Sequence, residues 1–288
     1  MSRPAPTSSD HRSSDPGSTP APLRGGPRQA VVLIAAVAAV GVSFLGSGAL
    51  GGTPIAEAAG GALSADATLL APAGPAFVIW SLIYTALLVT AVVQALPSRR
   101  DDARLDRTAP ALVLALLLNP AWILVVQAGW LLGSVLVIAA LAVALVRLWV
   151  ALLPAAPTRD RWLLDVPVGL YLGWVLAATA ANTAAYVDEQ IMAVGPAYAL
   201  SLLIVVTALS AGLAWAHPAG AAVAAATAWG AGWIAYGRLD GDPPSTVVGV
   251  AAAVAAAILV LVALLRSTLR ARERGADAHT VRTGDSPG

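Results

Sequence analysis

A series of apolar stretches, each about as long as a bilayer core is thick, constrains this chain more than any other feature. A helix needs roughly 20 apolar residues to cross the hydrocarbon core. The stretches that meet this requirement lie at about 30–50, 75–96, 109–127, 130–153, 163–185, 194–215, 218–236 and 246–265. Charged residues make up only 11% of the chain, against roughly a quarter in soluble domains. The sequence therefore predicts an all-α integral membrane protein with eight transmembrane helices, of which the seventh is the least hydrophobic.

The positions of the basic residues test this count independently. All 17 are arginine, and the short cytoplasmic segments of membrane proteins collect Lys and Arg. If the N-terminus is cytoplasmic, eight crossings place every arginine except Arg238 on the cytoplasmic side. We therefore expect a multi-pass protein of the cell membrane with both termini in the cytoplasm.

The two ends of the chain differ sharply in composition from the middle. Residues 1–29 are rich in Ser, Pro, Asp and Arg and cannot bury enough apolar surface to fold, so they predict a disordered cytoplasmic tail. Residues 266–288 predict a second disordered, arginine-rich cytoplasmic tail. The first apolar stretch could be a cleaved signal peptide, but its length favours a retained membrane anchor.

The helix at 163–185 has two contrasting faces. At about 100° per residue, four residues fall within one quarter of its circumference: Tyr171, Trp174, Ala178 and Asn182. The opposite face carries Gly169 and Gly173, a Gly-x-x-x-Gly step that lets a neighbouring helix backbone come close. The first face predicts a ligand-binding surface, and the second predicts a surface for close helix packing.

Two other helices carry similar aromatic stripes. Phe77, Trp80 and Tyr84 are spaced by three and four residues, which places their rings on one face of the second span. Asn119 and Trp122 are spaced by three residues in the third span. An Asn side chain inside a bilayer needs a hydrogen-bond partner, either a neighbouring helix or a ligand. From the residues alone, both interpretations stay open.

With these motifs, the chain resembles the tryptophan-rich sensory proteins, the bacterial relatives of the mitochondrial translocator (peripheral benzodiazepine receptor) protein. In that family, a proline-rich segment leads into the second helix, which begins with a Trp-x-x-x-Tyr motif. The third helix has an Asn-x-x-Trp motif. The fifth helix has a Tyr-x-x-Trp motif, and an Asn follows eight residues after its Trp. The residues that match are Pro72, Pro75, Trp80, Tyr84, Asn119, Trp122, Tyr171, Trp174 and Asn182. The resemblance covers about residues 30–186, and the three further helices are typical of longer members of the family.

The resemblance implies a five-helix ligand-binding core at 30–186 with three additional transmembrane helices at 187–265. It implies a membrane sensor or binding protein for flat hydrophobic molecules, such as porphyrin or haem, that aids their transport or turnover. Such a molecule would be a ligand, and no cofactor is required. The loop at 51–74 would serve as a lid, in which Glu57 and Asp66 would repel or steer a charged ligand. The expected ligand-binding residues are Phe77, Trp80, Tyr84, Asn119, Trp122, Tyr171, Trp174, Ala178 and Asn182.

Two other functions are consistent with the same residues. A secondary transporter of a small hydrophobic metabolite is suggested by the eight spans, the helices rich in small residues and Pro120 in the middle of the third span. An enzyme that degrades porphyrin is not expected, because the sequence offers no catalytic acid or base, but degradation stays open.

The remaining polar residues lead to further expectations. Asp165 and Arg147 are predicted to pair at the cytoplasmic boundary. The chain has no cysteine, and His217 is the only histidine of the membrane domain and lies in a loop, so no metal site is expected. The expected partners are the small hydrophobic ligand, the lipid bilayer and a second copy of the chain, for which the Gly169 and Gly173 face offers a surface; no nucleic acid partner is expected.

Overall fold

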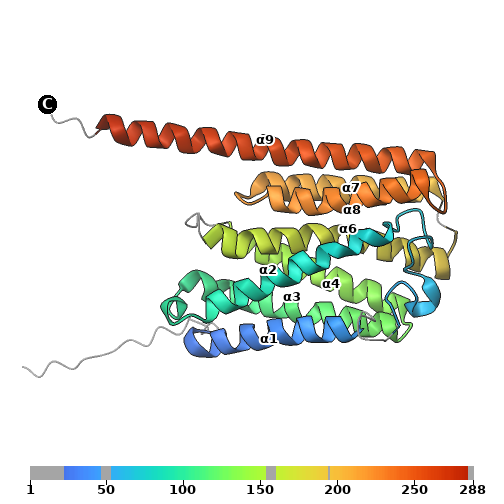
Figure 1. Ribbon diagram of the computed structural model, residues 1–288, viewed down its shortest axis with the longest axis horizontal. Coiled ribbons are helices and arrows are strands. Elements are labelled where there is room, and N and C mark those ends of the chain that lie inside the picture. Colours follow the sequence, from blue (N-terminus) through green and yellow to red (C-terminus); the bar gives the residue numbers. More distant parts are fainter. Residues whose placement is uncertain (1–22, 47–52, 154–159, 194, 285–288) are drawn as a thin grey trace, which may run out of the picture.

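The computed structural model describes residues 23–46, 53–153, 160–193 and 195–284, and the regular elements within these ranges are helices. Eight long helices lie side by side, with α1 at one edge of the bundle and α9 at the opposite edge (Figure 1). Their bounds are α1 Gly25–Gly46, α2 Ile79–Ala95, α3 Ala103–Gln127, α4 Leu131–Ala151, α6 Val166–Gln190, α7 Pro196–Ala216, α8 Ala221–Asp240 and α9 Thr246–Gly284. The first residue of α1 and the last of α9 lie at the same end of the bundle (Figure 1).

The predicted all-helical membrane architecture is confirmed. Seven of the eight helices are long and apolar enough to cross a membrane. The eighth is α8, whose sequence is rich in Ala and Gly and which was predicted to be the least hydrophobic span. Many residues of α8 are buried against α6 and α9. Helix packing therefore holds α8 in the bundle more than the hydrophobicity of its sequence does.

The two tail predictions differ from the structure at their inner boundaries. α1 already begins at Gly25, five residues before the predicted span, because Arg28 is buried within the bundle and bonds there to Asp106. α9 continues to Gly284, through most of the segment that was predicted to be disordered. The Arg, Ala and Glu residues of that segment have high intrinsic helix propensity, which lets a helix already started in the bundle continue. Residues 1–22 and 285–288 lie outside the described ranges.

Local sequence signals explain several helix ends. The Asp102 side chain caps α3 by accepting hydrogen bonds from the backbone N–H of Arg104 (3.0 Å) and Leu105 (3.2 Å). Gly129 has a φ of +72° in the tight turn between α3 and α4, a conformation that glycine adopts without strain. α3 itself runs through Pro120 without interruption.

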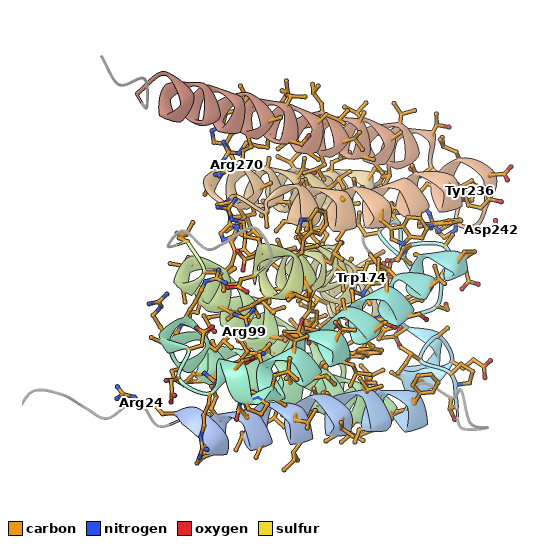
Figure 2. All side chains as sticks on the ribbon, turned by 60° about the vertical axis from the view of Figure 1, so that its left-hand side comes forward. Arg24, Arg99, Trp174, Tyr236, Asp242 and Arg270 are labelled. Carbon is orange, nitrogen blue, oxygen red and sulfur yellow. The ribbon has the colours of Figure 1, made fainter. Side chains whose placement is uncertain are left out.

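Ion pairs gather at one end of the bundle. Arg28 of α1 is buried and contacts Asp106 of α3 at 2.8 Å, and Arg104 of α3 contacts Asp165 at 2.7 Å. The prediction that Arg147 pairs with Asp165 is wrong: Arg147 is exposed on α4, and Arg104 reaches the carboxylate from another helix. Figure 2 shows Arg24, Arg99 and Arg270 at this end, away from Tyr236 and Asp242.

His217 follows α7 directly, as predicted for a loop residue, but its side chain is completely buried. Its ring lies against Trp149, with the centroids 3.9 Å apart, and its Nδ1 accepts a hydrogen bond from the Ala219 backbone N–H (3.0 Å). Burial lowers the pKa of His217 to about 4, so the ring is neutral at pH 7. The contacts hold the connection between α7 and α8 against α4.

The glycine face of α6 is covered by α8 of the same chain. A Cβ built on Gly173 would lie 2.3 Å from the Val223 carbonyl oxygen, and one built on Gly169 would lie 2.9 Å from the Ala222 Cβ. The helix backbones therefore approach as closely as glycine permits. The prediction that this face could join two copies of the chain is wrong, because α8 already occupies it.

We expect Gly173→Ala to destabilise the bundle by about 2 kcal/mol or more, because the added methyl group overlaps a backbone carbonyl that cannot move alone. Gly212→Ala is the matched control: nothing lies within 4 Å of a Cβ there, and alanine favours a helix over glycine by about 1 kcal/mol. Thermal unfolding of both variants in detergent checks this. Equal midpoints for the two variants would contradict the close α6–α8 contact.

Candidate ligand-binding cavity

The aromatic stripes of α2 and α6 meet inside the bundle. The Trp80 ring stacks on Tyr84, with centroids 5.0 Å apart and planes inclined by 21°, and meets Tyr171 and Trp174 edge to face at 6.0 and 6.1 Å. Phe77, one turn before Trp80, meets Trp174 edge to face at 5.8 Å. These centroid distances are in the favourable range for aromatic pairs. The helical spacing predicted from the sequence therefore brings five rings into one cluster, from the short 3-10 helix Gly74–Val78, from α2 that follows it and from α6.

A cavity of about 600 Å³ lies along this cluster, between α1, α2, α3 and the loop before α2. It is lined by Val40, Ser43, Phe44, Ile55, Ala56, Ala65, Gly74, Phe77, Trp80, Ser81, Tyr84, Thr85, Leu88, Trp122 and Ile123. Its lining side chains are uncharged. Ser81 and Thr85 on α2 and Phe44 on α1 are exposed, so the cavity opens sideways on the surface between these helices.

A second cavity of about 50 Å³ lies deeper, under the loop and against α6 and α8. It is lined by Ile55, Ala62, Leu63, Thr68, Ala71, Pro72, Phe77, Trp122, Trp174, Ala177, Ala178, Ala181, Asn182, Gly230 and Ile234. Phe77, Trp122 and Ile55 line both cavities. These three side chains therefore form the partition between the larger and the smaller space.

The two carboxamides have different positions. Asn119 donates hydrogen bonds to the Tyr84 hydroxyl (2.9 Å) and to Ser43 Oγ (3.2 Å), and it does not line either cavity. It connects α1, α2 and α3 and orients the Tyr84 ring, which lines the larger cavity. For Asn119 the structure therefore agrees with the interpretation as a link between helices.

Asn182 lies on the wall of the smaller cavity and also joins three helices. Its Oδ1 accepts a hydrogen bond from the Trp122 indole N–H (2.8 Å), and its Nδ2 donates to Ser134 Oγ (2.8 Å). The Trp122 ring is thereby fixed in the partition between the cavities. Asn182 thus shapes the site even without direct contact to a ligand.

The structure brings all nine predicted site residues together, but not all of them line a cavity. Phe77, Trp80, Tyr84 and Trp122 line the larger one, and Trp174, Ala178 and Asn182 line the smaller one. Tyr171 is buried behind the cluster, where its hydroxyl donates to the Ala115 carbonyl (3.1 Å). Tyr171 and Asn119 therefore support the lining residues from behind. For the seven residues that line a cavity, contact with a ligand stays a prediction.

A family model described as TSPO-like protein matches residues 29–265. This chain belongs to the TSPO-like protein family. The match confirms the resemblance drawn from the aromatic and Asn motifs, and it extends over the eight long helices of the bundle, including the last three. Searches of curated proteins and of solved structures found no match. Membership in the TSPO-like family supports a membrane protein that binds or transports a ligand.

The site of this TSPO-like protein includes residues that sequence reasoning missed. Gly230 and Ile234 of α8 line the smaller cavity, although they lie outside the predicted five-helix core at 30–186 and were not among the expected site residues. The Gly230 backbone lies against Trp174 and Ala177, so a side chain larger than hydrogen would intrude on the cavity wall. A signal existed in the run of Ala and Gly along α8, which is typical of a helix that packs closely on others.

No metal-binding cluster is formed by the His, Asp and Glu side chains of the described residues. One polar group in the wall has no partner there: the Trp174 indole N–H is buried and makes no hydrogen bond within the described structure. An unsatisfied buried donor costs about 1–3 kcal/mol.

We expect Asn182→Ala to lower stability by about 1–3 kcal/mol, because it leaves the Trp122 indole and Ser134 without their buried partner. The neighbouring Thr183→Ala is the control: its hydroxyl bonds only to the Thr179 carbonyl of its own helix (2.7 Å), and its loss should change stability by a few tenths of a kcal/mol. Thermal unfolding separates the two. If the unfolding temperature fell by the same amount in both variants, the hydrogen bonds of Asn182 to Trp122 and Ser134 would contribute no particular stability.

Proposed function

We propose that this TSPO-like protein binds flat hydrophobic ligands of the tetrapyrrole type, such as porphyrin or haem, and acts as a membrane sensor that aids their transport or turnover. The observation that carries the proposal is the cavity of about 600 Å³ beside the stacked Trp80–Tyr84 pair. Small-molecule pockets span about 300–1,000 Å³ and have mostly apolar walls with a few placed polar groups. The cavity has this size and this composition.

The position of the opening supports a ligand that partitions into lipid. The cavity opens between α1 and α2, where the surrounding surface carries exposed apolar side chains such as Phe44 and Leu82. A hydrophobic ligand dissolved in the membrane would enter there without crossing a polar barrier. Beyond the partition, the Trp174 indole N–H offers a hydrogen bond to a carboxylate or carbonyl group of the ligand.

The proposed location is the cell membrane, with both termini in the cytoplasm. The arginines Arg24, Arg99 and Arg270 lie at one end of the bundle, and short cytoplasmic segments collect such residues (Figure 2). The lid and the entrance to the smaller cavity would then face outward.

A reporter fused after Gly288 tests this orientation. We expect a reporter that is active only in the cytoplasm to be active in this fusion, and a reporter that is active only outside the cytoplasm to be inactive. The opposite result would contradict the proposed orientation.

Titration of the reconstituted protein with protoporphyrin tests the binding proposal. We expect saturable binding, and we expect the double variant Trp80→Leu with Trp174→Leu to bind about tenfold more weakly, since each ring contributes roughly 0.5–1.5 kcal/mol beyond its buried area. Trp162→Leu is the control, because Trp162 is exposed outside both cavities. Fluorescence anisotropy of the porphyrin gives a signal that does not depend on the number of tryptophans. Equal affinities of the double variant and the control would contradict the proposed site.

The same preparation separates the remaining functions. Accumulation of porphyrin inside sealed vesicles would indicate transport, and bleaching of its absorbance with time would indicate degradation. Binding without either would indicate a sensor.

A further inference from the structure

A buried arginine joins α8 to the loop that covers the smaller cavity. We call residues 53–73 the lid. The guanidinium of Arg238 donates hydrogen bonds to the backbone carbonyls of Thr68 (2.8 Å) and Ala65 (2.7 Å) in the lid, and to that of Asp242 (2.7 Å) in the connection between α8 and α9. Its side chain is only 1% exposed. One side chain of the last quarter of the sequence thus holds a loop of the first quarter.

The part of the lid that Arg238 holds is also the roof of the cavity. Leu63, Thr68 and Ala71 line the smaller cavity, and the carbonyls that accept from Arg238 lie within the same segment. The ends of the lid are held separately. The Gln127 side chain donates to the Thr53 carbonyl (2.8 Å) at the start, and the Trp233 carbonyl accepts from the Ala73 N–H (3.2 Å) at the end. Arg238 holds the middle.

The same face of α8 forms the wall and holds the lid. Gly230, Ile234 and Arg238 are spaced by four residues, so they follow one another along one side of the helix. The first two line the smaller cavity, and the third lies one turn further, beneath the lid. Any movement of α8 relative to α6 would therefore alter the cavity wall and the lid together.

We propose that Arg238 is a positioning residue that holds the lid closed over the smaller cavity and against the larger one, whose wall includes Ala65, so that the C-terminal helices control how tightly a ligand is retained. This inference rests on the proposed ligand-binding function. It assigns a role to the three additional helices, which would act on the pocket through α8.

The chemistry of the contact makes it both specific and reversible. A planar guanidinium presents several N–H groups in a fixed arrangement and can serve carbonyls of two separate loops, which a single ammonium group cannot do with the same geometry. Main-chain carbonyls neutralise no charge, and the carboxylates of Asp66 and Asp242 act on Arg238 only through space, so the buried cation is less stabilised than it would be beside a hydrogen-bonded carboxylate. When the lid lifts, water can replace the Thr68 and Ala65 carbonyls, while the Asp242 carbonyl stays beside Arg238. The closed state is therefore held firmly without being permanent.

A cysteine reporter in the lid tests this role without any ligand. The chain contains no cysteine, so Leu63→Cys introduces a single thiol into the lid, at a position that lines the smaller cavity. We expect a membrane-impermeant maleimide to label it at least tenfold faster when Arg238→Met is added, because the middle of the lid is then released. Arg147→Met is the matched control: it removes the same charge from an exposed position on α4. Equal labelling rates in the two variants, at unchanged thermal stability, would overturn the inference.

Arg238→Lys keeps the charge and provides a second measurement if Arg238→Met does not fold. The lysine variant should label at least threefold faster than the protein with Arg238 intact, and an unchanged rate would overturn the inference. Porphyrin dissociation from the same variants then separates this inference from the proposed function. Faster labelling in a protein that binds no porphyrin would support the role of Arg238 in lid closure and refute the tetrapyrrole proposal. If porphyrin binds but its dissociation is as slow in Arg238→Lys as in the unchanged protein, control of the ligand by Arg238 is refuted.

Discussion

The rest of the structure depends on how closely α8 approaches α6. At Gly173 the two backbones come so near that no side chain fits between them, and Thr227 of α8 donates a hydrogen bond to the Gly173 carbonyl at 2.9 Å. Thr227 also lies 3.0 Å from the Ser210 hydroxyl of α7, so the contact joins three helices. In a membrane, such packing and hydrogen bonding must replace the hydrophobic effect as the force between helices. The close approach brings Gly230 against Trp174 and thereby forms one wall of the smaller cavity.

The cavity is shaped by polar groups that satisfy one another. Asn119 orients Tyr84 and Asn182 orients Trp122, so each carboxamide fixes one aromatic ring of the lining. Buried polar groups in a bilayer rarely lack partners, because each unsatisfied one costs free energy. Among the residues of the cavity wall, the Trp174 indole N–H is an exception, because it makes no hydrogen bond within the described structure.

The three C-terminal helices belong to the same unit as the first five. The TSPO-like family model extends over both parts, and α8 contributes to the cavity wall, to the covering of α6 and to the contacts of the lid. At the opposite end of the bundle, Arg104 and His217 lie near Asp165, so this end too is built from both parts of the chain. A division into an independent core and an added segment therefore does not describe the packing, although it does describe the order of the motifs along the chain.

The sequence by itself determined the class of the protein, the approximate helices and the family. Apolar length predicts membrane spans, and helical periodicity places Phe77, Trp80 and Tyr84 on one face. Periodicity shows which residues share a face but not which helix that face meets. For this reason the tertiary structure alone decided that Arg104 and not Arg147 pairs with Asp165, that Asn119 lies behind the cavity, and that α8 covers the glycine face of α6. It also decided the place of Arg238, because a contact between residues 170 positions apart depends on the packing of every helix between them.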